Sequence, residues 1–379
     1  MKRIPLLIFV ALLVAACEDN IGTSSDVLPT SGMSVDAPSL GGPTGDEEPS
    51  YTLSLSASED EHWPAAPYYP EFRIMVEEAL AAYRPGDHFR WLSDGYSPTG
   101  QYLNYWHQKW GESETVQFDE EGIPQVKYDG VFYDHPVTLC RYALNLHGRI
   151  VRGEPELTEK FIKVVDRLLS LQDRKGAFLY PFPYRLYGHN FAPGWPSGMA
   201  QGMGLSVLRR AYDLTKDRKY LLPGNRAAYF FLRTREEGGV RTTLADLDPS
   251  LSGYVWLEEF ATVPANYKLN GFMFTLFGLY DWWQRDPNAT TGSIALAGDL
   301  FREGVKTVEA TLHYFDMDGY TTTDLRYIVV PGTMPRMNQP YHRIHIFQLH
   351  TLAEITGSPV LKRYENLWRY YVEAPLGPW

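Results

Sequence analysis

Apolar residues recur at the spacing of one helix face through most of the chain from residue 71 to residue 372. This period predicts a mainly helical body, because a strand requires strict alternation. One segment, Thr115–Tyr133, predicts a strand hairpin with turns at Glu121-Gly122 and Asp129-Gly130, and Phe178–Tyr187 and Tyr320–Val330 are expected to be extended. The predicted helices are Glu71–Tyr83, Pro136–Val151, Glu156–Gln172, Ser197–Leu214, Tyr220–Arg233, Leu269–Arg285, Ala295–Tyr314, His342–Ile355 and Val360–Val372.

Short polar turns join three pairs of these helices, at residues 152–157, 215–221 and 356–361. Short connections make antiparallel neighbours, so the pattern predicts a series of helical hairpins. We expect residues 61–379 to form an all-α domain, an α/α toroid with a small β-hairpin element near its N-terminal side. A superhelical solenoid is the alternative, but solenoid repeats are usually more regular.

The first 17 residues have the layout of an export signal. Met1-Lys2-Arg3 is positive, Ile4–Val14 is apolar, and the small pair Ala15-Ala16 precedes Cys17. This end resembles a bacterial lipobox, in which the cysteine becomes lipidated. An ordinary signal peptide with an incidental cysteine is the alternative. We expect a protein of the cell envelope, anchored through Cys17 to a bacterial membrane and facing the periplasm or the exterior.

Composition separates a tether from the body. Residues 18–60 are rich in Ser, Gly, Pro, Thr, Asp and Glu and lack apolar periodicity, which is typical of a disordered tether. Of the 2 cysteines, lipidation of Cys17 leaves Cys140 in an apolar stretch, which predicts a buried, inert thiol and no intrachain disulfide. The net charge of −11 argues against a nucleic-acid partner. Aromatic residues make up 14% of the chain, and Tyr and Trp suit sugar-binding clefts.

Two segments combine carboxylates, phenols, imidazoles and guanidinium groups next to predicted helices, namely Trp256–Phe272 and Asp316–His345. Such a set suits proton transfer to and from a sugar acid. His342 and His345 lie one turn apart, but no third ligand follows at a convincing spacing, so no metal site is predicted. No loop typical of nucleotide, flavin or phosphate binding is visible, and no cofactor is expected.

Several separated motifs follow one another in order along the chain. They are Ser197–Gly202 within Trp195–Asp217, Glu258-Glu259, Leu269–Met273, Gly278–Asp281, Asp324–Arg326, Tyr341-His342, His345 and Gln348-Leu349. In these motifs the chain resembles, over residues 130–375, the helical C-terminal domain of the glucuronyl C5-epimerases of heparan sulfate maturation. The resemblance implies an α/α toroid that inverts carbon 5 of a uronic acid within a polymer, without a redox cofactor, and a homodimer as a further implication.

The chain departs from the family pattern at two tyrosines. The family places a tyrosine after the paired glutamates, where this chain has Phe260, and another before Asp-Leu-Arg, where it has Thr323. Tyr341 is retained, and Glu259 matches the family's acidic partner. Tyr320, three residues before Thr323, is a candidate to reach the same space from an extended loop.

The chemistry assigns roles to these residues. Inversion at carbon 5 needs one group to take a proton and another to give one, and Glu259 and Tyr341 are the predicted catalytic pair. The uronate carboxylate must also be neutralised, which guanidinium or imidazole groups do through charge-assisted hydrogen bonds. The predicted substrate-binding residues are Arg326, His342, His345, Tyr320, Arg343 and Asn270.

Each residue also has a structural interpretation. Glu258 and Glu259 are placed to cap or pair near the helix that begins at Leu269, and Tyr341 suits a core position. Arg326 suits an ion pair with Asp324, while Asn270 suits close helix packing.

The leading functional prediction is an epimerase acting outside the cytoplasm on a glucuronate-containing polysaccharide. A lyase is the first alternative, because the same carbanion can expel the substituent on carbon 4. A non-catalytic glycan-binding or envelope-assembly protein is the second, and an unrelated toroid glycosidase is the third.

Overall fold

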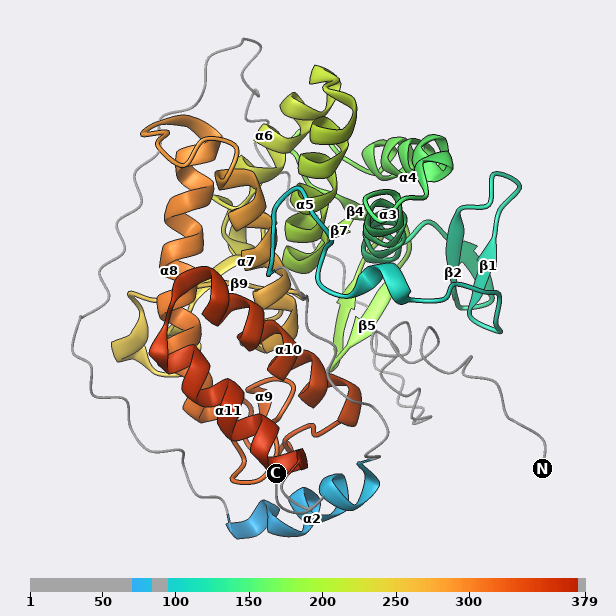
Figure 1. Cartoon of the computed structure of the whole chain (residues 1–379). Coiled ribbons are helices and arrows are strands. Elements are labelled where there is room, and N and C mark those ends of the chain that lie inside the picture. Colours follow the sequence, from blue (N-terminus) through green and yellow to red (C-terminus); the bar gives the residue numbers. More distant parts are fainter. Residues whose placement is uncertain (1–69, 84–94, 374–379) are drawn as a thin grey trace, which may run out of the picture.

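The structure is a computed structural model that describes residues 70–83 and 95–373 (Figure 1). The predicted signal peptide, Cys17 and the tether over residues 18–60 lie outside the described residues. The boundary of the toroid domain at residue 61 lies outside them as well, so it stays a prediction.

All nine predicted helices are present, each within about one turn of its expected ends. A tenth, α9 (Arg326–Val329), is a single turn inside the segment that we expected to be extended. No helix in the described ranges is both long enough and apolar enough to cross a bilayer. The nine are α2 (Arg73–Ala82), α3 (Pro136–Ile150), α4 (Thr158–Ser170), α5 (Gly198–Thr215), α6 (Leu221–Phe230), α7 (Leu269–Trp283), α8 (Gly292–Phe315), α10 (Gln339–Thr356) and α11 (Pro359–Glu373).

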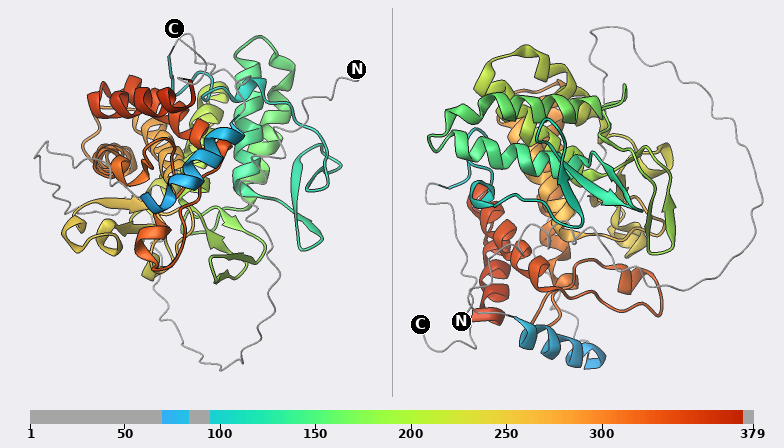
Figure 2. Two further views of the ribbon diagram at one scale, coloured as in Figure 1. Left: turned by 90° about the horizontal axis from the view of Figure 1, so that it is seen from below. Right: turned by 90° about the vertical axis from the view of Figure 1, so that its right-hand side faces the viewer.

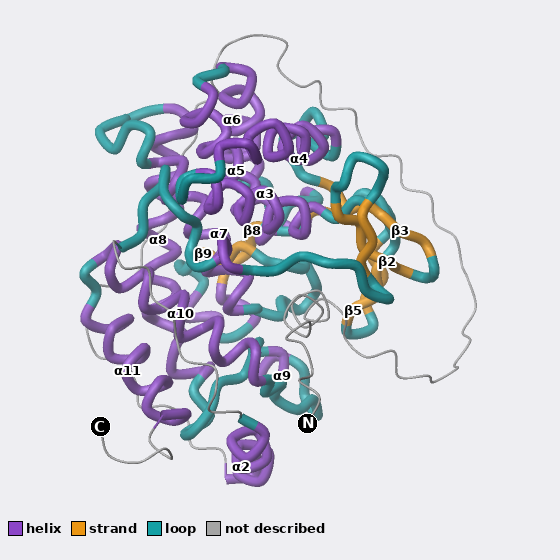
Figure 3. The backbone as a smooth tube through the Cα atoms, turned by 45° about the vertical axis from the view of Figure 1, so that its right-hand side comes forward, coloured by secondary structure: helices purple, strands orange, loops and turns teal. Residues whose placement is uncertain are grey.

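The three predicted helical hairpins form. Helices α3 and α4, α5 and α6, and α10 and α11 pack as neighbours, while α7 packs against α5, α8 and α10 (Figure 3). The turn after α5 uses Lys216 with φ of 58°, and the turn after α10 uses Gly357 with φ of 70°, both left-handed helix ends. The mainly helical class is therefore confirmed, and the toroidal closure of the hairpins stays a prediction.

Small antiparallel sheets join the helices. The predicted hairpin is confirmed as β1, β2 and β3, which lie beside α3 at one side of the molecule (Figure 1). The other strands were not predicted individually, because two or three residues are too few to show a period. The strands are β1 (Val116–Phe118), β2 (Pro124–Tyr128), β3 (Val131–Tyr133), β4 (Leu179–Tyr180) paired with β7 (Trp195–Pro196), β5 (Tyr184–Leu186) paired with β6 (His189–Phe191), and β8 (Arg241–Thr243) paired with β9 (Val255–Leu257).

Helices α5 and α7 approach closely at glycines of the two family motifs. A Cβ added to Gly278 would lie 1.8 Å from the Gly202 carbonyl oxygen, and one added to Gly202 would lie 2.4 Å from the Cα of Thr275. Backbone atoms occupy these positions, so a larger residue would push the helices apart. The motif glycines therefore serve packing. Cys140 is fully buried, as predicted, and burial raises the pKa of its thiol well above the usual range.

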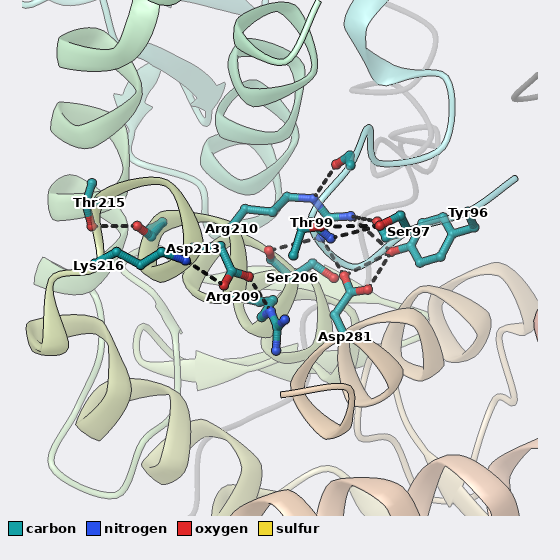
Figure 4. Close-up of polar contacts among 12 residues, drawn as sticks. Tyr96, Ser97, Thr99, Ser206, Arg209, Arg210, Asp213, Thr215, Lys216 and Asp281 are labelled. Atoms are coloured by element: carbon teal, nitrogen blue, oxygen red, sulfur yellow. Dashed lines mark hydrogen bonds and ion pairs between the residues drawn. The ribbon is translucent and has the colours of Figure 1, made fainter. Parts of the chain in front are cut away.

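A buried ion pair ties the C-terminal half of α7 to α5 (Figure 4). Arg210 Nη1 donates to Asp281 Oδ2 at 2.6 Å, and both side chains are fully buried. The Tyr96 hydroxyl donates to the same carboxylate at 2.9 Å, and Arg210 also donates to the Ser97 and Gly100 carbonyl oxygens. The pair thereby fixes the segment that contains Tyr96 against the two central helices.

Helix α2 packs beneath the segment between α8 and α10 (Figure 2). Its Val76 is 1% exposed, and Phe72 meets the Tyr327 ring edge-on at 5.9 Å. Arg73 donates to the Asp318 carbonyl oxygen at 3.3 Å. An N-terminal helix thus supports the segment in which the Asp324–Arg326 motif lies.

Candidate active site

The paired glutamates follow strand β9 and lie against the start of helix α7. Glu259 is 5% exposed, and its Oε2 lies 2.3 Å from the position that a Cβ on Gly271 would take. Only a glycine in the first turn of α7 leaves room for this carboxylate. Gly271 therefore has a definite function in the site, which is to admit the Glu259 side chain.

Lys268 is the N-cap residue of α7, and its side chain points among the predicted site residues. Its Nζ lies 5.3 Å from the centroid of the Phe260 ring and 5.7 Å from the centroid of the Tyr341 ring. Lys268 is only 3% exposed. A cation over two aromatic rings at this depth is uncommon. The sequence analysis did not single out Lys268, because it precedes a predicted helix and belongs to no motif.

The three tyrosine positions of the family pattern converge here. Phe260 and Tyr341 flank the Lys268 ammonium, and the Thr323 carbonyl oxygen accepts from the Leu269 amide at 3.2 Å. The predicted pair, Glu259 and Tyr341, is thus brought to one end of α7. Phe260 and the Thr323 backbone also lie at this end of α7, but neither residue carries a phenol.

Glu258 has a different environment from Glu259. Its side chain is fully buried, and its Oε1 accepts from the Tyr267 amide at 3.3 Å. Burial raises the pKa of Glu258 well above its usual range, although the Tyr267 amide and the charge of Arg235 oppose the shift. Burial therefore favours the neutral form of the Glu258 carboxyl group. The structural interpretation suits Glu258 better than Glu259.

The two predicted substrate-binding histidines lie in a buried cluster under α10. The Thr321 hydroxyl is 2.9 Å from His342 Nδ1 and 3.1 Å from His345 Nδ1, and His342 Nε2 is 3.1 Å from the Trp368 carbonyl oxygen. That carbonyl can only accept, so His342 carries its proton on Nε2 and accepts from Thr321. The Thr321 oxygen then accepts from His345 Nδ1–H.

Burial lowers the pKa of His342 to about 3 and lowers the pKa of His345 well below its usual range. Both imidazoles are therefore neutral at pH 7, and neither is a cation for a uronate carboxylate. Tyr320 belongs to the same cluster, because its ring stacks on His342 at 4.2 Å and it is fully buried. Substrate binding by these three residues stays a prediction that the contacts do not favour.

Arg326 lies in a second polar cluster, built around Tyr187 at the tip of the β5–β6 hairpin. The Tyr187 hydroxyl donates to Asp324 Oδ2 at 2.5 Å and accepts from Arg336 Nη1 at 3.1 Å. The Arg326 guanidinium lies over the Tyr187 ring, 4.6 Å from its centroid, and the Arg326 amide donates to Asp324. Tyr187 adopts a left-handed φ of 51°, followed by Gly188 at 82°. Sequence reasoning missed Tyr187 and Arg336, because no local signal links the hairpin tip to Asp324.

The two remaining predicted residues lie on different helices. Asn270 is in the first turn of α7 and 4% exposed; its carbonyl oxygen accepts from Gln348 Nε2 at 2.9 Å. Its side-chain Oδ1 has no hydrogen-bond partner among the described residues. A buried acceptor of this kind is suited to a ligand hydroxyl. Arg343 is partly exposed on α10, and its charge acts on Tyr320.

Aromatic rings extend from Phe260 toward the surface. The Phe260 ring lies 5.6 Å from the rings of Trp195 and Tyr184 and 6.2 Å from that of Phe191, measured between centroids. Tyr184 and Phe191 are partly exposed, so this wall reaches solvent. Flat apolar faces with polar edges suit sugar rings. Within residues 70–83 and 95–373, no group of three or more His, Cys, Asp or Glu side chains is arranged to hold a metal ion.

Comparison with known proteins agrees with this geometry. The sequence profile described as D-glucuronyl C5-epimerase C-terminus matches residues 172–370, more than half of the chain. The chain belongs to this family. The match confirms the resemblance seen in the motifs, and it includes Glu259, Lys268, Thr323 and Tyr341.

Two relatives show how far the similarity extends. The chain is 32% identical over 240 residues to the D-glucuronyl C5-epimerase of Caenorhabditis elegans, which is 61% of this chain and 38% of the relative. It is 28% identical over 217 residues to an uncharacterised protein of Methanocaldococcus jannaschii, 56% of this chain and 65% of the relative. The chain therefore spans less than two thirds of either relative.

Proposed function

We propose that this member of the epimerase family inverts carbon 5 of glucuronate residues in a polysaccharide outside the cytoplasm. The observation that carries the proposal is the convergence of Glu259 and Tyr341 on the first turn of α7, next to the Lys268 ammonium. A carboxylate, a phenol and a cation form the minimal set for removing and returning a proton beside a carboxylate.

The reaction follows from the chemistry of the substrate. The hydrogen on carbon 5 lies alpha to a carboxylate and is a very weak acid. One member of the Glu259–Tyr341 pair takes this proton, and the electron pair of the broken C–H bond moves into the carboxylate. The other member then delivers a proton to the opposite face of carbon 5, which inverts it. One group thus gains the proton removed from carbon 5 and the other loses the proton delivered to it, and exchange with solvent restores both. No cofactor is invoked.

The polymer is held by two further features. The partly exposed aromatic wall of Tyr184 and Phe191 offers faces on which sugar rings stack. The guanidinium groups of Arg326 and Arg336 at Tyr187 offer positive charge to uronates along the chain of the polymer. We also propose the α/α toroid for the helical hairpins, with the site at one end of it.

A lyase is the second candidate, because Phe260 and Thr323 stand where the family pattern has two tyrosines that could deliver the second proton. If the second proton is not delivered, the carbanion expels the substituent on carbon 4. A glycan-binding protein without catalysis is the third candidate, on the same replacements. The lipid anchor through Cys17, the envelope location and a homodimer remain part of the proposal.

The deciding experiment is deuterium incorporation in heavy water, with the chain from about residue 61 and a panel of glucuronate-containing polysaccharides. Deuterium at carbon 5 with both uronate epimers in the product supports the epimerase. An unsaturated product that absorbs in the ultraviolet identifies the lyase instead. Binding without exchange, from a folded protein, supports the non-catalytic alternative.

A further inference from the structure

Resting on the proposed function, we propose that Lys268 is a catalytic residue that binds the carboxylate of the uronate being inverted. Lys268 belongs to none of the family motifs, so the resemblance gives it no role. The proposal concerns the reacting sugar, and the arginines at Tyr187 are assigned to uronates elsewhere along the polymer.

The first argument is the position of the ammonium group. Lys268 Nζ lies 5.7 Å from the centroid of the Tyr341 ring, the phenol retained from the family pattern. It lies 5.3 Å from the centroid of Phe260, the ring that lacks the family's hydroxyl. The ammonium is therefore beside the proposed proton-transfer group and beside the position where a polar group has been lost.

The second argument is burial. Lys268 is 3% exposed, and a lysine is almost never so deeply buried without a compensating interaction. In a medium of low dielectric, a cation of this kind binds an anion far more strongly than an exposed lysine does.

The third argument is the chemical requirement for a cation. Loss of the carbon-5 proton places a second negative charge on the uronate carboxylate, so a fixed positive charge there lowers the barrier. The imidazoles of His342 and His345 cannot supply it, because burial keeps both neutral. Arg326 lies over the Tyr187 ring instead. Lys268 is a cation whose Nζ lies 5.7 Å from the centroid of the Tyr341 ring.

Two neighbours make the same place favourable for a bound sugar acid. Lys268 caps α7, a helix of 15 residues, whose N-terminal end carries partial positive charge. Asn270, in the first turn, has a buried Oδ1 without a hydrogen-bond partner among the described residues. That acceptor suits a sugar hydroxyl next to a carboxylate held by Lys268.

The test compares three variants of the full chain. Lys268→Met keeps the length and the apolar stem and removes the charge, whereas Lys268→Arg keeps the charge. Lys127→Met is the matched control, because Lys127 Nζ also lies over an aromatic ring, 5.6 Å from the Phe132 centroid, but Lys127 is an exposed residue of strand β2. Circular dichroism and thermal unfolding establish that each variant is folded.

The probes are a hexasaccharide containing glucuronate and the same hexasaccharide with its carboxylates reduced to alcohols. Calorimetric titration gives the ratio of their dissociation constants. A charge-assisted hydrogen bond of roughly 1.5–3 kcal/mol from Lys268 multiplies this ratio by about 10–150. We expect Lys268→Met to lower this ratio to near that of the arginine contacts alone, and Lys268→Arg and Lys127→Met to preserve it. Carbon-5 exchange by Lys268→Met falls by at least about 100-fold.

The outcomes separate this inference from the proposed function. If Lys268→Met keeps the full ratio while the unaltered protein exchanges deuterium, the inference is overturned and the epimerase stands. If the ratio depends on Lys268 but no exchange occurs, the epimerase fails and the carboxylate site stands. An unaltered protein that binds neither probe overturns both. Should Lys268→Met fail to fold, Lys268→Gln against Lys268→Arg gives the same comparison.

Discussion

The two ends of helix α7 both bury polar groups, but they satisfy them differently. At the C-terminal end, the Asp281 carboxylate receives hydrogen bonds from Arg210 and Tyr96, and Arg210 donates to further carbonyl oxygens. At the N-terminal end, Asn270 Oδ1 has no hydrogen-bond partner among the described residues. The Asp281 carboxylate is fully paired, whereas the Asn270 side chain has a buried acceptor without a partner.

This difference separates structure from function within one helix. Buried charges that are fully paired hold structural elements together. Removing one partner leaves the other charge buried without compensation, which destabilises the fold. Buried polar atoms without a hydrogen-bond partner reduce stability, and each such atom in a native protein needs an explanation, such as a bound ligand that supplies the partner. The family motifs include both ends, so the motifs alone do not distinguish them. We expect variants of the proposed catalytic residues at the N-terminal end to affect activity, and variants of the ion pair at the C-terminal end to affect stability.

The largest effect is expected for Glu259→Gln. Removing one proton-transfer group lowers the rate of carbon-5 exchange by about 10²–10⁴-fold. The free energy of unfolding should change by less than about 1 kcal/mol, because glutamine has the same shape and the carboxylate is in a site rather than in a closed network. Exchange is measured by mass spectrometry in heavy water, and unfolding by denaturant titration.

The matched control is Glu354→Gln, which alters an exposed carboxylate on α10 and should leave both quantities unchanged. Tyr341→Phe should reproduce the loss of exchange. Full exchange by Glu259→Gln would remove Glu259 from the mechanism.

The opposite pattern is expected for Asp281→Ala. The variant leaves Arg210 buried without its counter-ion, which should lower the free energy of unfolding by about 3–5 kcal/mol. The rate of exchange per folded molecule should stay within a few-fold of the unaltered protein. The double variant Arg210→Met with Asp281→Leu should recover much of the stability, since both charges are gone. A stable Asp281→Ala protein that had lost exchange would place this network in the site.

The helices and their hairpins could be predicted from the sequence, because period and turn chemistry are local. The strands β4 to β9 could not be predicted individually, since each pair forms through contacts of only two or three residues. The site divided in the same way. Glu259 and Tyr341 were predicted from their motifs, whereas only the fold places Lys268 beside Tyr341 and Tyr187 beside Asp324.

The histidines show the limit of spacing arguments. His342 and His345 lie one turn apart, so they share a helix face, but the sequence does not say whether that face meets solvent or the core. In the structure both are fully buried against Thr321. The adjacent glutamates show the same limit, because Glu258 turns inward to the Tyr267 amide while Glu259 lies over Gly271.

Glu258→Gln should stabilise the protein in a pH-dependent way. Burial raises the pKa of Glu258 well above its ordinary 4.5, so the stability that its neutral form contributes is complete below pH 4.5 and is lost as pH rises toward the folded-state pKa. Glutamine does not titrate. The free energy of unfolding of the variant should therefore exceed that of the unaltered protein by up to about 1.4 kcal/mol for each pH unit above 4.5. If Glu258→Gln and the unaltered protein had the same free energy of unfolding at pH 4 and again at pH 8, the folded protein would accommodate the ionised Glu258 carboxylate without a cost.

The smallest effect is expected for Thr321→Val, at about 1–3 kcal/mol of lost stability. Valine keeps the shape but leaves His342 Nδ1 and His345 Nδ1 without the hydroxyl that joins them. Denaturant titration at pH 8 measures the loss with both imidazoles neutral in the folded and unfolded states, and Thr321→Ser, which keeps the hydroxyl, should lose less. Because burial lowers the pKa of His342 to about 3, both proteins should also lose stability as pH falls from 6.5 toward 3. The measurement that matters for the site is kcat/KM for exchange, which we expect to be unchanged in Thr321→Val. A rise in KM would show that the histidine cluster contacts the substrate. The substrate site would then include residues of α10 as well as the N-terminal end of α7.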